Sequence, residues 1–245
     1  ILEAKYMKVI YIPFKKKSFV YLAILIVVIT LMIVVLYKTN SQKVFNIISV
    51  PQPIYKGDES KAMVSFACNV VWGTEYIPQM LDIFREKGIK ITFFIGGEWA
   101  SDNPDLLQQM VREGHELGNH GYYHKHHSQL SFDENRKEIS QTEDIIYELT
   151  GVKTVLFAPP YGEFNNTTLK AADSLGYKTI MWSIDTIDWR REGAQVITNR
   201  VLKNPHNGAI ILMHPVEDTV EALPTIIDQL RAKGFEIGKV SDVLP

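Results

Sequence analysis

Residues 61–95 read KAMVSFACNVVWGTEYIPQMLDIFREKGIKITFFI and contain two apolar segments around one amphipathic segment. The apolar segments, residues 62–67 and 92–95, have the length and composition of buried β-strands. Residues 76–87 predict a helix that ends at Gly88, because its apolar residues recur at a spacing of three and four. These apolar residues are Ile77, Met80, Leu81 and Phe84. The stretch therefore predicts a strand–helix–strand unit with parallel strands.

The same alternation continues to the end of the chain. Further strands are predicted at residues 116–118, 155–157, 178–182 and 209–213. Helices are predicted to end near residues 113, 150, 175, 202 and 233, and a capping box at residues 131–134 marks the start of one of them. This order predicts an α/β fold, either a distorted (β/α) barrel of about seven strands or an open doubly wound sheet. No glycine-rich phosphate loop follows a predicted strand, which favours the barrel.

Residues 19–37 form an apolar segment of nineteen residues without a charged side chain. A helix of this length crosses a hydrocarbon layer about 30 Å thick, so we predict a transmembrane helix. Three lysines at residues 15–17 precede it, and the positive-inside rule places the N-terminus in the cytoplasm and the rest of the chain outside the cell membrane. A cleaved signal peptide and a buried core element are the alternatives. The polar exit at residues 38–43 favours an uncleaved, single-pass signal anchor.

The net charge of −2 over 245 residues hides a division along the chain. A predicted cytoplasmic tip, residues 1–18, carries five lysines and one acid, and a predicted stalk, residues 38–60, carries three lysines and two acids. The predicted domain at residues 61–245 is therefore acidic, which disfavours binding to nucleic acid and to anionic wall polymers. Met7 is the expected natural start, with residues 1–6 derived from upstream sequence.

Five of the seven histidines lie between residues 115 and 127. His120 and His124 stand four positions apart, and on a helical turn this spacing brings two imidazoles to one side, at about 5 to 6 Å between Cβ atoms. Such a pair is suited to one divalent metal ion. Two ligands are fewer than a zinc site normally has, and an exposed histidine-rich loop is the alternative.

His214 follows the predicted strand at residues 209–213, at the end of the strand where functional side chains gather in a parallel α/β fold. A histidine held there is a candidate general acid when a carboxylate partner sets its pKa. Asp185 and Asp188 are the candidate partners, with helix capping or loop solvation as the alternative for each. Trp189 is a candidate wall of an apolar cleft, with core packing as its alternative.

These motifs, in this order, resemble those of the polysaccharide deacetylases of carbohydrate esterase family 4, whose shared unit is the NodB homology domain. The family's second motif, His-Ser/Thr-x-x-His/Ser, is met by residues 120–124. Its fourth, Asp-x-x-Asp-Trp, is met by residues 185–189, and its fifth, Leu-x-x-His, is nearly met by residues 211–214. The resemblance implies a distorted (β/α) barrel that removes acetyl groups from N-acetylglucosamine. It also implies zinc or another divalent metal to polarise the carbonyl and activate water, with a metal-free protein as the alternative.

The resemblance gives each matched residue a role. The implied metal ligands are His120, His124 and, at a changed position, Cys68. The implied general acid is His214, tuned by Asp188, and the implied groove residues are Tyr161, Pro160 and Trp189. The expected partner is a neutral N-acetylated cell-wall glycan, peptidoglycan or chitin-like. Wall-facing domains of this type resemble those linked to bacterial sporulation and cell-wall maturation.

Two family motifs are altered in this sequence. The first, Thr-Phe-Asp-Asp-Gly, aligns with residues 65–69, so that Ala67 replaces the base and Cys68 replaces the third metal ligand. The third, Arg-x-Pro-Tyr, begins at Ala158 where the family has the arginine that orients the base. The losses are consistent with each other, because an arginine without its carboxylate partner would be a partly buried unpaired charge.

Three hypotheses follow from these changes. An ordinary deacetylase needs a substitute base, for which Glu75 is the nearest downstream acid. An altered hydrolase uses the thiolate of Cys68, the only cysteine, to complete a metal site, and without a base its rate falls by about 10² to 10⁴. A non-catalytic surface protein keeps the groove and binds wall glycan. We therefore expect reduced or absent activity.

Overall fold

A computed structural model describes residues 16–48 and 50–245, which belong to two compact units that divide at residue 49. In the first unit, helix α1 runs over Lys16–Ile48. Its segment Phe19–Lys38 has a mean hydropathy of 3.3 and is long and apolar enough to cross a membrane, as is a signal sequence. Residues 1–15, which include the expected start at Met7, lie outside the described residues.

The second unit is built on one sheet of parallel strands. The strands are β1 (Met63–Val70), β2 (Thr92–Ile95), β3 (Glu116–Asn119), β4 (Leu156–Phe157), β5 (Lys178–Thr179), β6 (Ile184–Asp185), β7 (Ala209–Met213) and β8 (Glu236–Gly238). Their order is β5-β4-β3-β2-β1-β7-β6, and β8 pairs with the start of β1. The path ends at β5 and β6, so the barrel is open there in the described chain. The predicted α/β class and distorted barrel are confirmed.

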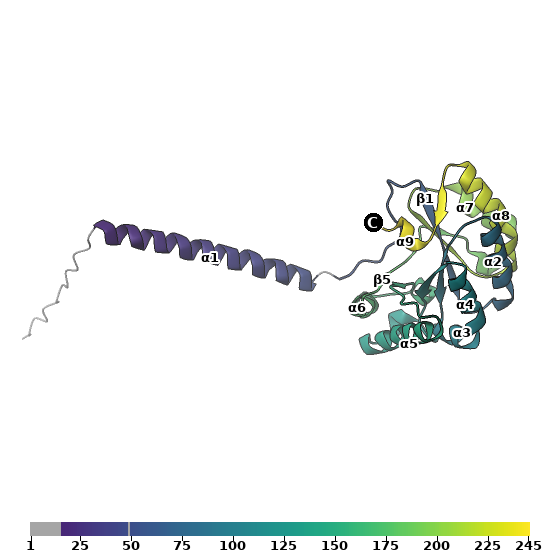
Figure 1. Ribbon diagram of the computed structural model, residues 1–245, viewed down its shortest axis with the longest axis horizontal. Coiled ribbons are helices and arrows are strands. Elements are labelled where there is room, and N and C mark those ends of the chain that lie inside the picture. Colours follow the sequence, from purple (N-terminus) through teal and green to yellow (C-terminus); the bar gives the residue numbers. More distant parts are fainter. Residues whose placement is uncertain (1–15, 49) are drawn as a thin grey trace, which may run out of the picture. The chain divides into compact units, whose positions relative to one another are not determined.

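Helices follow most of the strands and lie on the outside of the sheet (Figure 1). They are α2 (Ile77–Glu86), α3 (Gly97–Asp102), α4 (Pro104–Arg112), α5 (Phe132–Thr150), α6 (Asn166–Ser174), α7 (Ala194–Lys203) and α8 (Glu217–Ala232). The short helix α9 (Val240–Val243) packs instead on the other face of β1, with Ala67 and Phe94. The predicted apolar face of α2 is buried. The predicted capping box is also confirmed, because the side chains of Ser131 and Glu134 each accept the other's backbone N–H at the start of α5.

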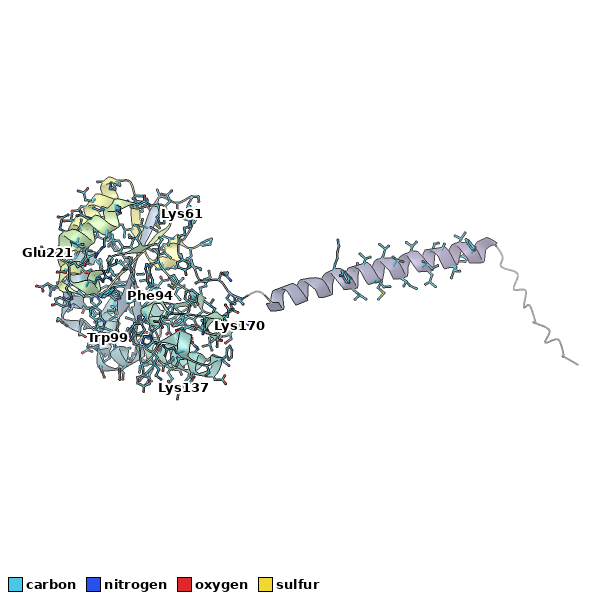
Figure 2. All side chains as sticks on the ribbon, turned by 180° about the vertical axis from the view of Figure 1, so that it is seen from behind. Lys61, Phe94, Trp99, Lys137, Lys170 and Glu221 are labelled. Atoms are coloured by element: carbon cyan, nitrogen blue, oxygen red, sulfur yellow. The ribbon has the colours of Figure 1, made fainter. Side chains whose placement is uncertain are left out.

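Strand β1 separates two apolar layers of the core. Val64, Phe66, Cys68 and Val70 pack with the apolar side chains of α2 and α8, and the intervening Ala67 packs on the opposite face with Phe94 and Ala158. Figure 2 shows Phe94 inside the unit and Lys61, Lys137, Lys170 and Glu221 on its outside. Successive side chains of a strand point to opposite faces. Since β1 continues to Val70, beyond the predicted end at residue 67, this alternation also governs the residues at the site.

The segment before β1 differs from the stalk predicted at residues 38–60. Helix α1 extends to Ile48, and the second compact unit begins at Val50 rather than near Lys61. Within this segment, Gly57 donates its N–H to the Gly208 carbonyl at 2.7 Å and Asp58 donates to the Val243 carbonyl at 2.7 Å. The residues before β1 therefore pack on the barrel because their backbone groups find partners there.

Candidate functional site

A cavity of about 500 Å³ opens at the C-terminal ends of the strands, where βα loops meet in a barrel of this kind. Its lining residues are Asn69, Val71, Trp72, His120, His124, Tyr161, Gly162, Trp182, Asp185, Trp189, Leu212 and His214. Of the predicted site residues, the cavity brings together His120, His124, Tyr161, Trp189 and His214. The other predicted residues are buried outside this lining: Cys68, Ala67, Ala158, Pro160 and Asp188.

His120 and His124 form one side of the cavity, with ring centroids 5.1 Å apart. The Nδ1 of His120 lies 2.7 Å from the carbonyl oxygen of Ala158, a contact that places the ring proton on Nδ1 and leaves Nε2 as the unprotonated nitrogen. Burial and the neighbouring His124 hold the pKa of His120 well below its usual value. Burial and the nearby His214 lower the pKa of His124 to about 4. Both imidazoles are therefore neutral near pH 7.

The loop that carries His124 is held by a buried carboxylate that the motif does not contain. Glu138 of α5 accepts the backbone N–H groups of Tyr122 at 3.0 Å and Tyr123 at 2.8 Å, and it forms an ion pair with Lys125 at 2.7 Å. His124 itself has a φ of 51°, which is uncommon for a residue other than glycine. This role could not be predicted from the sequence pattern, because a glutamate within a polar helix pattern is normally exposed.

His214 and Asp188 form a second polar pair beside the cavity. Asp188 Oδ1 lies 2.7 Å from His214 Nδ1, and Asp188 Oδ2 accepts the backbone N–H of His214 and the hydroxyl of Thr219, each at 2.6 Å. Burial opposes ionisation of Asp188, but these hydrogen bonds outweigh it and lower the pKa of the carboxyl below its usual value. Because the carboxylate of Asp188 holds Nδ1 of the ring, Nε2 is the nitrogen left to carry a proton and donate it, as a general acid must.

Aromatic side chains surround the opening of the cavity. Tyr161 and Trp189 are 55% and 53% exposed, as expected for residues that meet a ligand rather than the core. The ring of His126 stacks on Tyr161, with centroids 4.0 Å apart. Trp72, which the sequence analysis did not select, stacks on the ring of His214 with centroids 5.6 Å apart. Its position just after β1 was the available signal, since side chains after strand ends form the site in this fold.

Cys68 does not join the two histidines. Its side chain is fully buried in the apolar layer between β1 and the outer helices, with Phe66, Val70 and Met213. Burial, with Asp188 nearby, raises the pKa of the thiol well above its usual value, so the thiolate that zinc requires is disfavoured. Within the described residues, no group of three or more His, Cys, Asp or Glu side chains is placed to hold a metal ion. The predicted Cys-His-His set is therefore not assembled.

Asn69 and Val71 are the residues around the end of β1 whose side chains line the cavity. Asn69 is 6% exposed, and its Oδ1 has no hydrogen-bond partner among the described residues. Ala67 shares the face of Asn69 but is buried deeper, against Phe94 and Ala158, and Cys68 packs on the other face of the strand. Carboxylates would therefore reach this cavity from positions 69 and 71, and not from positions 67 and 68. The residues near the end of β1 that face the cavity thus lie two and three positions beyond those predicted for the two acids.

The other altered or alternative positions also lie away from the cavity surface. Ala158 is 4% exposed and shares an apolar cluster with Ala67, so an arginine at position 158 would bury its charge beside an apolar group. Its carbonyl nevertheless orients His120. Glu75, the candidate substitute base, is exposed in the turn after β1 and is absent from the described cavity lining. Asp185 is the carboxylate in that lining.

Comparisons with known proteins match this geometry. The sequence profile of a family described as polysaccharide deacetylase matches residues 56–180. The uncharacterized protein YlxY of Bacillus subtilis is 41% identical over 194 residues, which cover 79% of this chain and 61% of that protein. A peptidoglycan-N-acetylglucosamine deacetylase of Bacillus cereus is 36% identical over 185 residues, which cover 74% of this chain and 67% of that protein. This chain thus spans less than two thirds of YlxY.

Two related solved structures share the fold of the second unit. BA3943 of Bacillus anthracis, a CE4 family pseudoenzyme, matches with a TM-score of 0.78 at 41% identity, over 80% of this chain and 69% of that chain. A BA3943 mutant with restored enzymatic activity matches with a TM-score of 0.78 at 39% identity, over 80% of this chain and 72% of that chain. In BA3943, one scaffold thus serves a pseudoenzyme and a variant with restored activity, so activity there depends on substituted residues rather than on the fold.

Proposed function

This chain belongs to the polysaccharide deacetylase family, and from that premise we propose that its folded unit binds N-acetylated cell-wall glycan without appreciable hydrolysis. One observation carries the proposal. The end of β1 contributes the amide of Asn69 and the apolar side chain of Val71 to the cavity, and neither group accepts a proton near neutral pH. The loss of a general base lowers a hydrolysis rate by about 10² to 10⁴.

The remaining walls of the cavity support glycan binding. Exposed aromatic rings at its opening, Trp72, Tyr161 and Trp189, provide flat apolar surfaces with polar edges, a combination that suits sugar rings. Inside, His120, His124 and the Asn69 amide offer polar groups for the acetamido substituent. A site of this size with a few convergent polar groups is typical of ligand pockets.

A second candidate function is weak N-deacetylation, and the intact Asp188–His214 pair favours it. Asp185 is the carboxylate within the described cavity lining, so it is the candidate base for residual activity. Its Oδ1 accepts the N–H of Ile187 at 2.8 Å, which ties it to its own turn. Residual acetate release that is lost in His214→Ala and Asp185→Asn variants would support this candidate over the first.

A zinc ion fits the described residues poorly. His120 and His124 supply two neutral imidazoles, fewer than the three or four protein ligands of most zinc sites, and Cys68 packs on the other side of β1. We therefore assign no step to a metal and propose that the native protein acts without one. Metal analysis of the purified protein that found stoichiometric zinc would contradict this.

We also propose that residues 19–37 anchor the protein in the cell membrane, with the N-terminus in the cytoplasm and the folded unit facing the wall. The apolar segment Phe19–Lys38 supports an anchor, although a signal sequence has the same composition. Recovery of the full-length chain in the membrane fraction, with the folded unit open to external protease, tests this proposal. A shortened chain in the culture medium would identify a signal peptide instead.

The main test restores carboxylates at the two positions that line the cavity. In full-length protein we expect Asn69→Asp/Val71→Asp to gain zinc and to release acetate from N-acetylated chitooligomers or peptidoglycan, with the unchanged protein binding these glycans but releasing little or none. Adding Ala158→Arg restores the arginine of the third motif. The readouts are metal content, acetate release and glycan affinity.

A matched control places the same two acids at positions 67 and 68. Ala67→Asp/Cys68→Asp introduces carboxylates into apolar layers, so it should lose stability and gain neither zinc nor activity. The proposal is wrong if the unchanged protein binds no N-acetylated glycan, or if it releases acetate as fast as the restored variant.

A further inference from the structure

The turn between β6 and α7 carries two adjacent arginines that directly follow Trp189, a residue of the cavity lining. Trp189 lines the cavity, and the guanidinium of Arg190 lies 5.0 Å from the centroid of its ring. The guanidinium of Arg191 lies 5.8 Å from the ring of Tyr76, in the turn that follows β1 and Trp72. Each guanidinium therefore lies over an aromatic ring, that of Arg190 over a residue of the cavity lining and that of Arg191 over the neighbouring turn after β1.

Neither arginine has a carboxylate partner in the part of the chain that the structure describes. Both are exposed, and within the described residues no carboxylate lies within 4.0 Å of either guanidinium. The neighbouring Glu192 pairs with Arg200, and Arg85 on α2 pairs with Glu113, so other arginines of the unit are engaged. The donors of Arg190 and Arg191 thus remain available to a ligand.

The turn holds these side chains in a defined place. Ile187 and Arg191 have φ values of 52° and 55°, which are uncommon outside glycine and persist where surrounding contacts impose them. Asp185 accepts the N–H of Ile187, and the buried Asp188 connects the turn to β7 through His214. A guanidinium on such a turn loses less freedom when it binds a ligand.

We propose that Arg190 and Arg191 bind a carboxylate of the glycan, so that the cavity selects muramyl-containing strands over neutral N-acetylglucosamine polymers. The planar guanidinium has the geometry that carboxylates prefer. Muramyl residues without a stem peptide carry a free carboxylate on their lactyl ether, whereas the same carboxyl is an amide where a stem peptide is attached, and chitin-like chains carry none. The strands selected are therefore peptide-free muramyl strands. This inference rests on the proposed function and revises the expectation of a neutral partner, because a local pair of cations outweighs the acidic average at short range.

The test compares three tetrasaccharides that differ in charge, using full-length protein in mild detergent. One alternates N-acetylglucosamine with N-acetylmuramic acid and has free lactyl carboxylates, the second is the same compound with methylamide groups in their place, and the third is chitotetraose. We expect the acidic compound to bind most tightly. Arg190→Ala/Arg191→Ala should lower the affinity for the acidic compound by about tenfold or more, because the variant loses hydrogen bonds from guanidinium to carboxylate. The affinities for the two neutral compounds should stay within about twofold of those of the unchanged protein.

Arg136→Ala is the matched control variant. Arg136 is also exposed and lies 5.8 Å from an aromatic ring, that of Phe132, but at the start of α5 and outside the cavity lining. Its loss should change none of the three affinities. Equal binding of all three compounds by the unchanged protein, or equal weakening of all three in the double variant, would overturn the inference and leave the proposed function intact. Failure to bind any of them would contradict the proposed function itself.

Discussion

The two sides of the cavity have kept different amounts of a catalytic apparatus. The histidine wall, formed by His120, His124 and the Asp188–His214 pair, has its polar atoms oriented by specific hydrogen bonds. The β1 wall, formed by Asn69 and Val71, presents an apolar side chain and an amide oxygen that has no hydrogen-bond partner among residues 16–48 and 50–245. A hydrolase needs both walls, whereas a binding protein needs their shape and some of their polarity.

The difference follows from how each wall is held in the fold. Asp188 is fully buried and accepts three hydrogen bonds, so its replacement would leave several donors unsatisfied. Asn69 and Val71 face the cavity, where a change of side chain leaves the packing of β1 on its other face intact. The histidine wall is therefore constrained by stability as well as by function, and the β1 wall is constrained mainly by function.

The largest expected effect comes from breaking the histidine wall. Asp188→Ala should lower the free energy of unfolding by about 3 to 5 kcal/mol, because the ring and backbone N–H of His214 and the hydroxyl of Thr219 lose a buried acceptor. Denaturant unfolding of the full-length protein, followed by tryptophan fluorescence, measures it. Asp185→Ala is the control and should cost less than about 1 kcal/mol, since this partly exposed carboxylate makes one such bond. Equal losses of unfolding free energy in the two variants would show that Asp188 is not the buried acceptor that holds the histidine wall.

Lowering the pH should have an intermediate effect on the free energy of unfolding. The histidines and Asp188 of the histidine wall should contribute to it over different ranges of pH. The pKa of His124 is lowered to about 4 and that of His120 lies well below 6.5. Below pH 6.5, therefore, these two histidines bind protons in the unfolded chain while they stay neutral in the folded protein. Stability is therefore fully present above about pH 6.5 and is lost as the pH falls toward 4, by up to about 1.4 kcal/mol per pH unit for each histidine. Asp188, whose pKa is lowered from 3.8, adds its loss only at still lower pH.

The pH effect is measured as the slope of the unfolding free energy between pH 6.5 and 4. His120→Gln/His124→Gln should reduce that slope, although His115, whose buried ring has its pKa lowered to about 4, keeps part of it. His206→Gln is the control, because that residue lies away from the cavity and near Asn207. A slope unchanged in the double variant would show that the histidine wall does not carry the effect.

The sequence predicted the order of elements, the barrel and most of one wall, because these depend on local signals. Apolar periodicity locates helices and strands, His120 and His214 follow strands directly, and His124 stands four positions after His120. Prediction failed at β1, where an apolar run carries no signal for where the strand ends. Placing its end at residue 67 instead of Val70 made Cys68 a residue of the loop, although it belongs to the strand face that packs on helices.

Contributions from distant segments were also beyond local signals. Glu138 supports the loop of His124 from a helix that begins after it in the chain, and its burial depends on tertiary packing. The segment before β1 was assigned to a stalk because it lacks periodicity. Its partners, the carbonyls of Gly208 and Val243, lie far along the chain and become visible only in the folded unit.

The smallest expected effect sharpens the contrast between the two faces of β1. Cys68→Ala should leave glycan affinity within about twofold while costing about 1 to 2 kcal/mol of stability, because the side chain fills the apolar layer behind the cavity. Asn69→Ala, one residue further along the same strand, should have the opposite effects. It should weaken the binding of N-acetylated glycans, since its amide faces the cavity, and leave stability nearly unchanged.

A thiol reagent should label the unchanged protein only on unfolding, because burial raises the pKa of the Cys68 thiol and blocks access to it. Rapid labelling of the folded protein, slowed by bound glycan, would place Cys68 in the cavity and return it to the site.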